Sequence, residues 1–340
     1  MLRSLAQKHH FLSRLVPPNA GQRCQRQPLL LQRYHSTSTT TTSDDDVPFD
    51  DKPFPFSRFE PCCPDSEVAA AENGFVPCSR HPIPNVIGKK IEMHEALKKT
   101  KTGRHLVACV GLDAPDWMRS KVETVKDGMM LSLSFAQNAW IKEQRKKPSS
   151  DTTAGGGSGE LFTTIIDRPS PNTEWPTSDI LLFPEFRRYP AAHPDKLLDS
   201  SITPLLDVLW ENPMCGILPH VENEQTLDDI DTIVLICTHT MRDKRCGVLG
   251  PLLVEEFRKV LKEQGLLKGQ ENGRVEVWGV SHFGGHKFAG NLIIHQKGLG
   301  GHMYGNVRQC HVPSIVDRHI INRKVIKELW RGAMTPPSVE

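Results

Sequence analysis

The sequence lacks any hydrophobic run long enough to cross a bilayer. Its best apolar stretches, residues 29–31 and 233–237, fall far short of the roughly 20 residues that a spanning helix needs. Hydrophobic residues still make up 38% of the 340 positions, which is enough for a buried core. The sequence therefore predicts a folded protein with no transmembrane segment.

Acidic residues are absent from the first 43 positions, which carry six arginines and lysines. Leu2, Leu5, Phe11, Leu12 and Leu15 are spaced so that one helical face could collect most of them. A basic, amphipathic segment without acidic residues is typical of a mitochondrial presequence. We therefore expect residues 1–43 to be a presequence and the protein to be mitochondrial, in the matrix rather than the intermembrane space.

An excess of basic residues is missing from the remainder of the chain. After residue 43, 36 basic residues stand against 40 acidic ones. A protein that binds nucleic acid in general needs a basic face to neutralise phosphates. The charge balance excludes that class, so we expect no nucleic-acid partner.

No Cys-x-x-Cys pair occurs, and nine cysteines in 340 residues are too sparse for a disulfide scaffold. Residues 44–95 are rich in proline and acidic residues at their start, and they are predicted to form an extended, partly disordered arm. Cys62, Cys63 and Cys78 in this arm, together with Cys215, are the candidate thiols of an alternative function, a thiol oxidoreductase. That function needs an accessible cysteine of low pKa, and no local context predicts one.

The hydrophobic pattern predicts an α/β fold. We expect strands near 105–111, 179–183, 230–237 and 274–280, helices from about 129 to 147, over 194–210, from Gly250 and over 314–330, and a hairpin of strands 291–295 and 303–307. The strand, helix, strand, hairpin, helix order of the last third predicts a thioredoxin-like ferredoxin domain at 216–332. A smaller α/β region at 96–215, with a Gly-rich insertion at 146–160, precedes it, and a tail at 333–340 follows it.

Four potential metal ligands stand at the ends of two predicted strands. Cys237 and Cys246 are separated by eight residues, and His282 and His286 by three. A cysteine just before a helix lies near its positive N-terminus, which lowers the thiol pKa. The glycines between the histidines permit a tight turn that points both imidazoles inward. Two cysteines and two histidines arranged in this way could close a [2Fe-2S] cluster with two ligands on each iron.

The residues alone leave other metal sites open. The histidine spacing suits a structural zinc site, although the gap between the cysteines exceeds that of ordinary zinc knuckles. A Rieske centre would use Cys-x-His, which Cys237-Thr238-His239 supplies, but the second box of that motif is missing. A zinc-stapled module that binds other proteins therefore remains an alternative to a redox protein.

The segments ICTHTMRDKRCGVLGP, VSHFGGHKFAGNLIIH and GHMYGNV resemble the sucrase/ferredoxin-like family of thioredoxin-like ferredoxins. In that family two cysteines and the two histidines of HxGGHK hold a [2Fe-2S] cluster. The resemblance therefore implies that Cys237, Cys246, His282 and His286 are the ligands. It implies a one-electron carrier or redox sensor, acting in mitochondrial thiol or redox homeostasis, rather than an enzyme, and it names no partner and no oligomeric state.

Histidine ligands change the chemistry of such a cluster. Neutral imidazoles in place of two thiolates make it less negative and raise its reduction potential. Each imidazole keeps a second nitrogen, so electron transfer is expected to couple to proton transfer. The charged loop 238–245 would lie beside the cluster and could dock an acidic redox partner, although an ordinary solvated loop explains its charges equally well.

Overall fold

The computed structural model describes residues 103–146, 161–171, 173–214, 217–326 and 329–335, together with a two-residue strand, β1 (Phe56–Ser57). The chain divides into two units, residues 1–40 and 41–340, and only the second contains described residues. The expected presequence, most of the expected arm and the Gly-rich insertion beyond residue 146 lie outside the described residues. One part of the arm is described, because β1 pairs in parallel with β11.

Ten strands form one mixed sheet in the order β12-β10-β9-β7-β8-β3-β2-β4-β5-β6. Its strands are β2 (His105–Cys109), β3 (Phe162–Ile166), β4 (Ser178–Phe183), β5 (Arg187–Ala192), β6 (Gln225–Thr226), β7 (Thr232–Cys237), β8 (Val275–Val280), β9 (Leu292–Gln296), β10 (Gly300–Tyr304) and β12 (Trp330–Thr335). The α-helices are α2 (Met129–Lys146), α3 (Thr203–Glu211), α4 (Lys244–Glu263) and α5 (Val312–Ile315). Shorter helical turns are η5 (Pro115–Met118), η6 (Val122–Thr124), η7 (Pro194–Lys196), η8 (His286–Phe288), η9 (Gln309–His311) and the π-helical η10 (Val316–Ile321), and β11 (Val325–Ile326) completes the elements. The predicted α/β class is confirmed.

The sheet contains the same arrangement twice. In the first repeat, β2 to α3, strand β2 lies parallel to β3 and antiparallel to β4, which pairs with β5. In the second repeat, β7 to α5, strand β7 lies parallel to β8 and antiparallel to β9, which pairs with β10. The two repeats join edge to edge through a short β3–β8 pairing. The strand, helix, strand, hairpin, helix order expected of a thioredoxin-like unit is therefore present in the second repeat, and the first repeat follows it as well.

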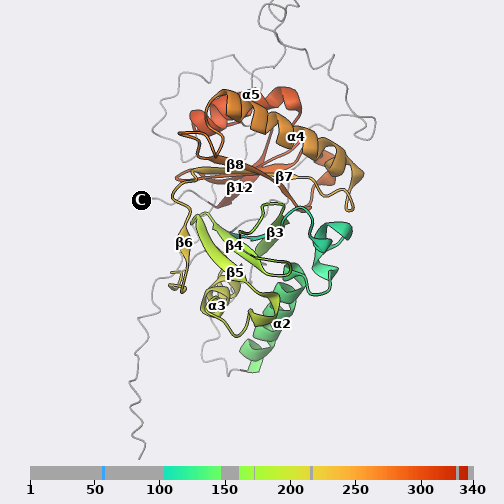
Figure 1. Cartoon of the computed structure of the whole chain (residues 1–340), viewed down its shortest axis with the longest axis vertical. Helices are drawn as coiled ribbons and strands as arrows, with labels where there is room; N and C mark the ends of the chain where they lie inside the picture. Colours follow the sequence, from blue (N-terminus) through green and yellow to red (C-terminus); the bar gives the residue numbers. More distant parts are fainter. Residues whose placement is uncertain are drawn as a thin grey trace, which may run out of the picture. The chain divides into compact units, whose positions relative to one another are not determined.

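Helices of the two repeats cover different faces of the strands (Figure 1). Leu253 and Phe257 of α4 pack on the second repeat in a core that includes Val234 of β7. Leu133 of α2 and Leu205 of α3 pack on the first repeat in a separate core. Strand side chains that point away from the helices form a third core, shared by both repeats: Val107, Leu181, Ile233, Leu235 and Ile293 belong to it. The two half-sheets therefore bury their helix-free faces together.

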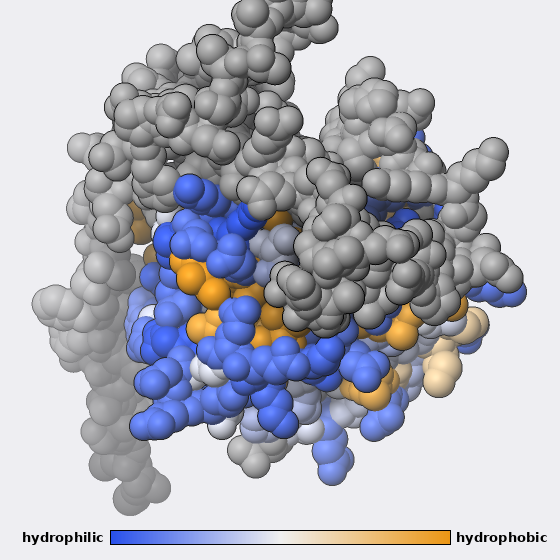
Figure 2. Space-filling model, turned by 90° about the horizontal axis from the view of Figure 1, so that it is seen from above, coloured by the Kyte–Doolittle hydropathy of each residue, from blue (hydrophilic) through white to orange (hydrophobic). Residues whose placement is uncertain are grey.

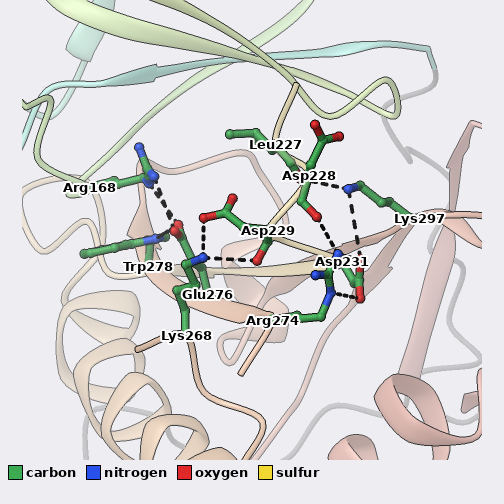
Figure 3. A network of polar contacts seen from close by, with 10 residues as sticks. All are labelled: Arg168, Leu227, Asp228, Asp229, Asp231, Lys268, Arg274, Glu276, Trp278 and Lys297. Atoms are coloured by element: carbon green, nitrogen blue, oxygen red, sulfur yellow. Dashed lines mark hydrogen bonds and ion pairs between the residues drawn. The ribbon is translucent and has the colours of Figure 1, made fainter. Parts of the chain in front are cut away.

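Charged side chains fix the segment that joins the repeats (Figure 3). Lys268 pairs with Asp229, and Arg274 pairs with Asp231, with 2.8 Å between its Nη2 and Asp231 Oδ1. Lys297 Nζ donates to the backbone oxygen of Leu227 at 2.7 Å. The linker is thereby held on the second repeat just before β7 begins.

Two predicted helices were placed wrongly. The helix expected over 314–330 ends as α5 and η10 by Ile321, and the chain then forms β11 and the edge strand β12. The helix expected over 194–210 is the turn η7 followed by α3. Trp330 packs against the core under α4, and Met334 belongs to the core that the repeats share. These contacts form only in the folded sheet, so the local hydrophobic periodicity did not predict strand β12.

Other boundaries shifted by a few residues. Helix α4 begins at Lys244, not near Gly250, because the Asp243 side chain caps it by accepting a hydrogen bond from Arg245 N at 2.9 Å. Pro251 consequently lies inside the helix. The second strand of the expected hairpin occupies Gly300–Tyr304, earlier than predicted. Strands β3, β5, β6 and β12 were not predicted.

The surface over α4 and α5 is mainly hydrophilic where it is drawn in colour, with hydrophobic areas bordered by hydrophilic residues (Figure 2). Val248 of α4 and Ile321 of η10 are among the exposed apolar side chains, at 39% and 49%. Of the helices in the described ranges, none combines the length and the apolar character that crossing a membrane requires.

Candidate metal centre

Cys237 ends the central strand of the second repeat. Strand β7 lies between β8 and β9, and the Cys237 backbone N–H donates to Asn291 O at 3.0 Å, which fixes the strand end. The side chain is 3% exposed and belongs to the core shared by the repeats. The thiol therefore lies at the carboxyl edge of β7 in an apolar environment.

Cys246 is the third residue of α4, the helix that follows β7. Two glycines allow this helix to approach the strand end closely: a Cβ at Gly250 would collide with the carbonyl oxygen of Cys237, and one at Gly247 would collide with Thr240. The sequence CGVLGP thus brings the first turn of α4 against the end of β7. The helix N-terminus favours negative charge on Cys246.

His282 follows β8 by two residues and faces both thiols. Its Nδ1 lies 3.7 Å from Cys237 Sγ and 3.9 Å from Cys246 Sγ. Gly284 and Gly285 then take φ of +94° and +71°, a conformation that favours glycine, and turn the chain into η8. His286 begins η8, and its side chain lies outside what the structure describes.

The structure brings three of the four predicted ligands together. One ligand atom from each of Cys237, Cys246 and His282 lies within 4.8 Å of the others. The pKa of Cys246 is lowered to about 6, first because it is hydrogen bonded with Cys237 and also because His282 lies beside it. The same hydrogen bond, together with burial, raises the pKa of Cys237 well above its ordinary value. A buried thiolate and thiol beside an imidazole form a donor set that suits zinc or an iron–sulfur cluster.

His239, the candidate from Cys237-Thr238-His239, is separate from this group of ligand atoms. Its Nε2 lies 2.8 Å from the backbone oxygen of Arg119, and its ring packs edge-on against Trp117. Burial lowers the pKa of His239. The side chain therefore joins the loop after β2 to the second repeat, and the Rieske alternative gains no support from its position.

A small hollow of about 80 Å³ opens beside His282. The first repeat contributes Ser120, Val122 and Glu123 to it, and the second contributes His239, Arg242 and His282. His282 is only partly buried, so its ring is reachable from this side. The metal site consequently has an approach from the surface that both repeats line.

Sequence reasoning missed two buried polar residues behind the histidine loop. Asn291 donates from Nδ2 to Gly285 O at 2.8 Å and accepts from Arg331 Nη1 at 2.7 Å. Arg331 comes from β12, a strand that was not predicted. Asn291 follows the HxGGHK motif by four residues and carries no recognisable metal-ligand signal, and Arg331 has no local sequence signal at all.

The remaining cysteines do not join the site. Cys109 is buried at the end of β2, as predicted for a core residue, and burial raises the pKa of its thiol to about 12. Cys310 is buried in η9. Cys62, Cys63, Cys78 and Cys215 lie outside the described residues.

Comparison with known proteins identifies the family. The sequence profile described as sucrase/ferredoxin-like matches residues 97–332, which is more than half of the chain and includes all three grouped ligands. The chain belongs to the sucrase/ferredoxin-like family. The family expected from the three segments is confirmed, and the match extends over both repeats.

Named relatives of this sucrase/ferredoxin-like chain come from yeasts. Altered inheritance of mitochondria protein 32 of Debaryomyces hansenii is 44% identical over 102 residues, which cover 29% of this chain and 35% of that protein. Actin patches distal protein 1 of Saccharomyces cerevisiae is 41% identical over 92 residues, 26% of this chain and 29% of that protein. The chain thus matches about a third of the length of these curated relatives.

Among solved structures, a thioredoxin-like [2Fe-2S] ferredoxin from Aquifex aeolicus is similar to part of the chain. The sequence identity is 16% and the TM-score is 0.25, with 33% of this chain and 99% of that chain covered.

Proposed function

We propose that this sucrase/ferredoxin-like protein is a one-electron carrier or redox sensor that holds a [2Fe-2S] cluster. The observation that carries the proposal is the meeting of Cys237, Cys246 and His282 within 4.8 Å, at the ends of β7 and β8 and in the first turn of α4. His286 completes the proposed ligand set. The two cysteines come from one strand–helix connection and the two histidines from one loop, which suits two ligands on each iron.

The surroundings of the thiols favour ligation. The hydrogen bond with Cys237 lowers the pKa of Cys246, which favours the ionised form that binds a metal. Metal binding would remove the remaining proton from Cys237, since thiolates are the ligands. When bound, the cluster would supply reversible one-electron chemistry, with a potential raised by its histidine ligands. The protein contributes an apolar wall on the strand side and an opening on the His282 side.

His282 is the proposed route for proton exchange. It lines the hollow beside the site, so protons can reach its ring from solvent. The proton affinity of a ligating imidazole depends on the charge of the metal it binds. Electron uptake should therefore be accompanied by proton uptake, and the reduction potential should fall with rising pH.

The surface around the hollow suits an acidic redox partner. Arg119, Lys121, Arg242 and Lys244 are exposed there, and they come from both repeats. Met118 and Met241 are also exposed, at 72% and 54%, and add apolar contact area. Such a surface can steer a negatively charged protein toward the cluster.

A mitochondrial location is proposed from two observations. The first 43 residues have the composition of a presequence, and several yeast relatives are called altered inheritance of mitochondria protein 32. We place the protein in the matrix, where a role in redox or thiol homeostasis would be exercised.

A structural zinc site is the second candidate, and the described distances favour it specifically. Ligands on one tetrahedral zinc at ordinary bond lengths lie about 3.5 Å apart when one is sulfur and one is nitrogen. The separations from His282 Nδ1, 3.7 and 3.9 Å, are close to this value. Binding of a cluster with the cysteines on one iron and the histidines on the other would move His282 away from the thiols.

Anaerobic purification of the full chain decides between the candidates. Iron, sulfide and zinc are assayed on one sample, and visible and electron paramagnetic resonance spectra are recorded before and after reduction with dithionite. Two irons, two sulfides and a Rieske-like signal on reduction support the electron carrier. A colourless protein with one zinc overturns it and leaves a structural module.

A further inference from the structure

A buried arginine lies behind the histidine loop. Arg331 of β12 is 7% exposed, and its guanidinium fills the space beside Gly285, where any Cβ would collide with it. It also stacks near Phe283 and Phe288, with 6.0 and 5.8 Å between Cζ and the ring centroids. Both aromatic residues belong to the segment that contains the two histidines, so the positive charge of Arg331 is buried directly behind this segment.

The hydrogen bonds of Arg331 do not balance its charge. Nη1 donates to Asn291 Oδ1 at 2.7 Å, and Nε is buried with no hydrogen-bond partner among the described residues. No carboxylate of the described ranges forms an ion pair with this guanidinium. A buried charge without a counter-charge is costly, so arginines in such positions are ordinarily paired.

Arg331 is connected to the end of β7 through Asn291. Burial lowers the pKa of Arg331 to about 10, and the charges of Cys237 and Cys246 oppose this shift. Asn291 connects Arg331 with Cys237, since its side-chain oxygen accepts from Arg331 and its backbone oxygen accepts from the Cys237 N–H.

We propose that Arg331 is a positioning residue that holds the turn between the two histidines, and that its buried positive charge stabilises negative charge on a group bound beside that turn. In the loaded protein it favours the reduced state, which carries one more negative charge, and this effect rests on the proposed function. Through Asn291 the same side chain holds Gly285 and thereby the turn between the histidines.

Substitution at position 331 tests the charge separately from the packing. Arg331→Met removes the charge and all donors, Arg331→Gln keeps a donor toward Asn291 without the charge, and Arg331→Lys keeps the charge. The matched control is Arg258→Met, since Arg258 also binds a backbone oxygen, Val277 O, and lies over an aromatic ring, Trp278, but comes from the middle of α4.

In cluster-loaded protein, the reduction equilibrium constant of Arg331→Gln should fall about tenfold at fixed pH, which is about 59 mV for one electron. Arg331→Lys should stay within about threefold of the unchanged protein, as should Arg258→Met. A potential that is unaltered in Arg331→Gln, with normal iron and sulfide content, overturns the proposal. An equal fall in Arg331→Lys overturns it too, because the charge would then not be the cause.

Metal-free protein gives a readout that does not depend on a cluster. Amide hydrogen exchange of residues 282–291, followed by mass spectrometry, reports how firmly the histidine turn is held. Exchange in this segment should rise severalfold in Arg331→Met, which loses the hydrogen bond to Asn291, and stay unchanged in Arg258→Met. If the protein binds zinc and no iron, the electron-carrier proposal fails while this exchange still decides the positioning role of Arg331. Unchanged exchange in a folded Arg331→Met variant refutes it.

Discussion

Cys109 and Cys237 occupy equivalent positions in the two repeats. Cys109 ends β2 and pairs in register with Ile166 at the end of β3, as Cys237 ends β7 and pairs with Val280 at the end of β8. Two residues after these partners stand Arg168 in the first repeat and His282 in the second. The same strand ends therefore carry the candidate ligand His282 in the second repeat and Arg168 in the first.

In the first repeat, the residue equivalent to His282 forms an ion pair. Arg168 Nε binds Glu276 Oε2 at 2.8 Å, and Trp278 Nε1 donates to the same oxygen at 2.6 Å (Figure 3). Burial raises the pKa of Cys109 to about 12, so its thiol stays neutral. Arg168, at the position equivalent to His282, thus helps to join the repeats, because Glu276 belongs to β8 of the second repeat.

The first prediction compares the two equivalent cysteines. Cys237→Ser should abolish iron and sulfide binding, because it removes a thiolate ligand. Cys109→Ala should keep the visible absorption and lose about 1 kcal/mol of unfolding free energy, as is typical of a small truncation in a core. Absorption spectra and denaturant unfolding measure the two effects. Loss of colour in a folded Cys109→Ala variant would show that the ligand set is misplaced.

Replacement of His282 by cysteine is the second prediction. A thiolate in place of a neutral imidazole makes the cluster more negative, so the midpoint potential should fall by on the order of 100 mV. The slope of potential against pH should also decrease, since one titrating ligand is lost. Protein-film voltammetry from pH 6 to 10 measures both. His239→Asn is the control, because His239 lies beside His282 without belonging to the ligand group, and an identical slope in wild type and His282→Cys contradicts the assignment.

The grouping of Cys237, Cys246 and His282 was predictable from sequence because its signal is local. Cys237 and Cys246 bracket a strand end and a helix start, and Gly284 and Gly285 mark the turn, so each pair could be recognised within a few residues. Arg331 could not be found in this way, since it reaches the site through the pairing of β12 with β10. The relation between Cys109 and Cys237 was hidden for the same reason, because the sequence does not show that β2 and β7 are equivalent strands.

The sequence did not predict strand boundaries correctly where the burial of a side chain depends on tertiary contacts. In β12, Arg331 and Met334 are buried and Ala333 is partly exposed, a pattern that resembles neither a clear helix nor a clear strand. The helix expected from Gly250 begins six residues earlier, at Lys244, because the Asp243 side chain caps its first turn.

The third prediction concerns adjacent glycines of the histidine turn. Both have positive φ, so alanine at either position costs about 1–2 kcal/mol of backbone strain. A Cβ at Gly284 meets no atom within 4 Å, whereas one at Gly285 collides with the Arg331 guanidinium. Gly284→Ala should therefore show only the strain, while Gly285→Ala should be less stable and should lower metal content. Thermal unfolding and metal analysis of the pair test this, and equal effects of the two substitutions would argue against the contact with Arg331.

The fourth prediction concerns two histidines between the repeats. His105 Nδ1 and His295 Nε2 lie 3.0 Å apart, in a hydrogen bond between β2 and β9. Burial lowers the pKa of both rings, that of His295 to about 3, so each is neutral in the folded protein at neutral pH. The unfolded chain takes up protons below about pH 6.5, whereas the folded chain does not. Stability from these groups is complete above that pH and is lost as the pH falls toward 3.

The expected loss is about 1.4 kcal/mol per pH unit for each histidine over that range. His295→Gln keeps hydrogen-bonding groups but cannot take up a proton, so its unfolding free energy should change less steeply between pH 6 and 4. Chemical denaturation of metal-free protein at several pH values measures the slope. His220→Gln is the control, because that side chain is 82% exposed. If His295→Gln and wild type lose stability at the same rate on acidification, the buried histidine pair does not set the acid sensitivity of the fold.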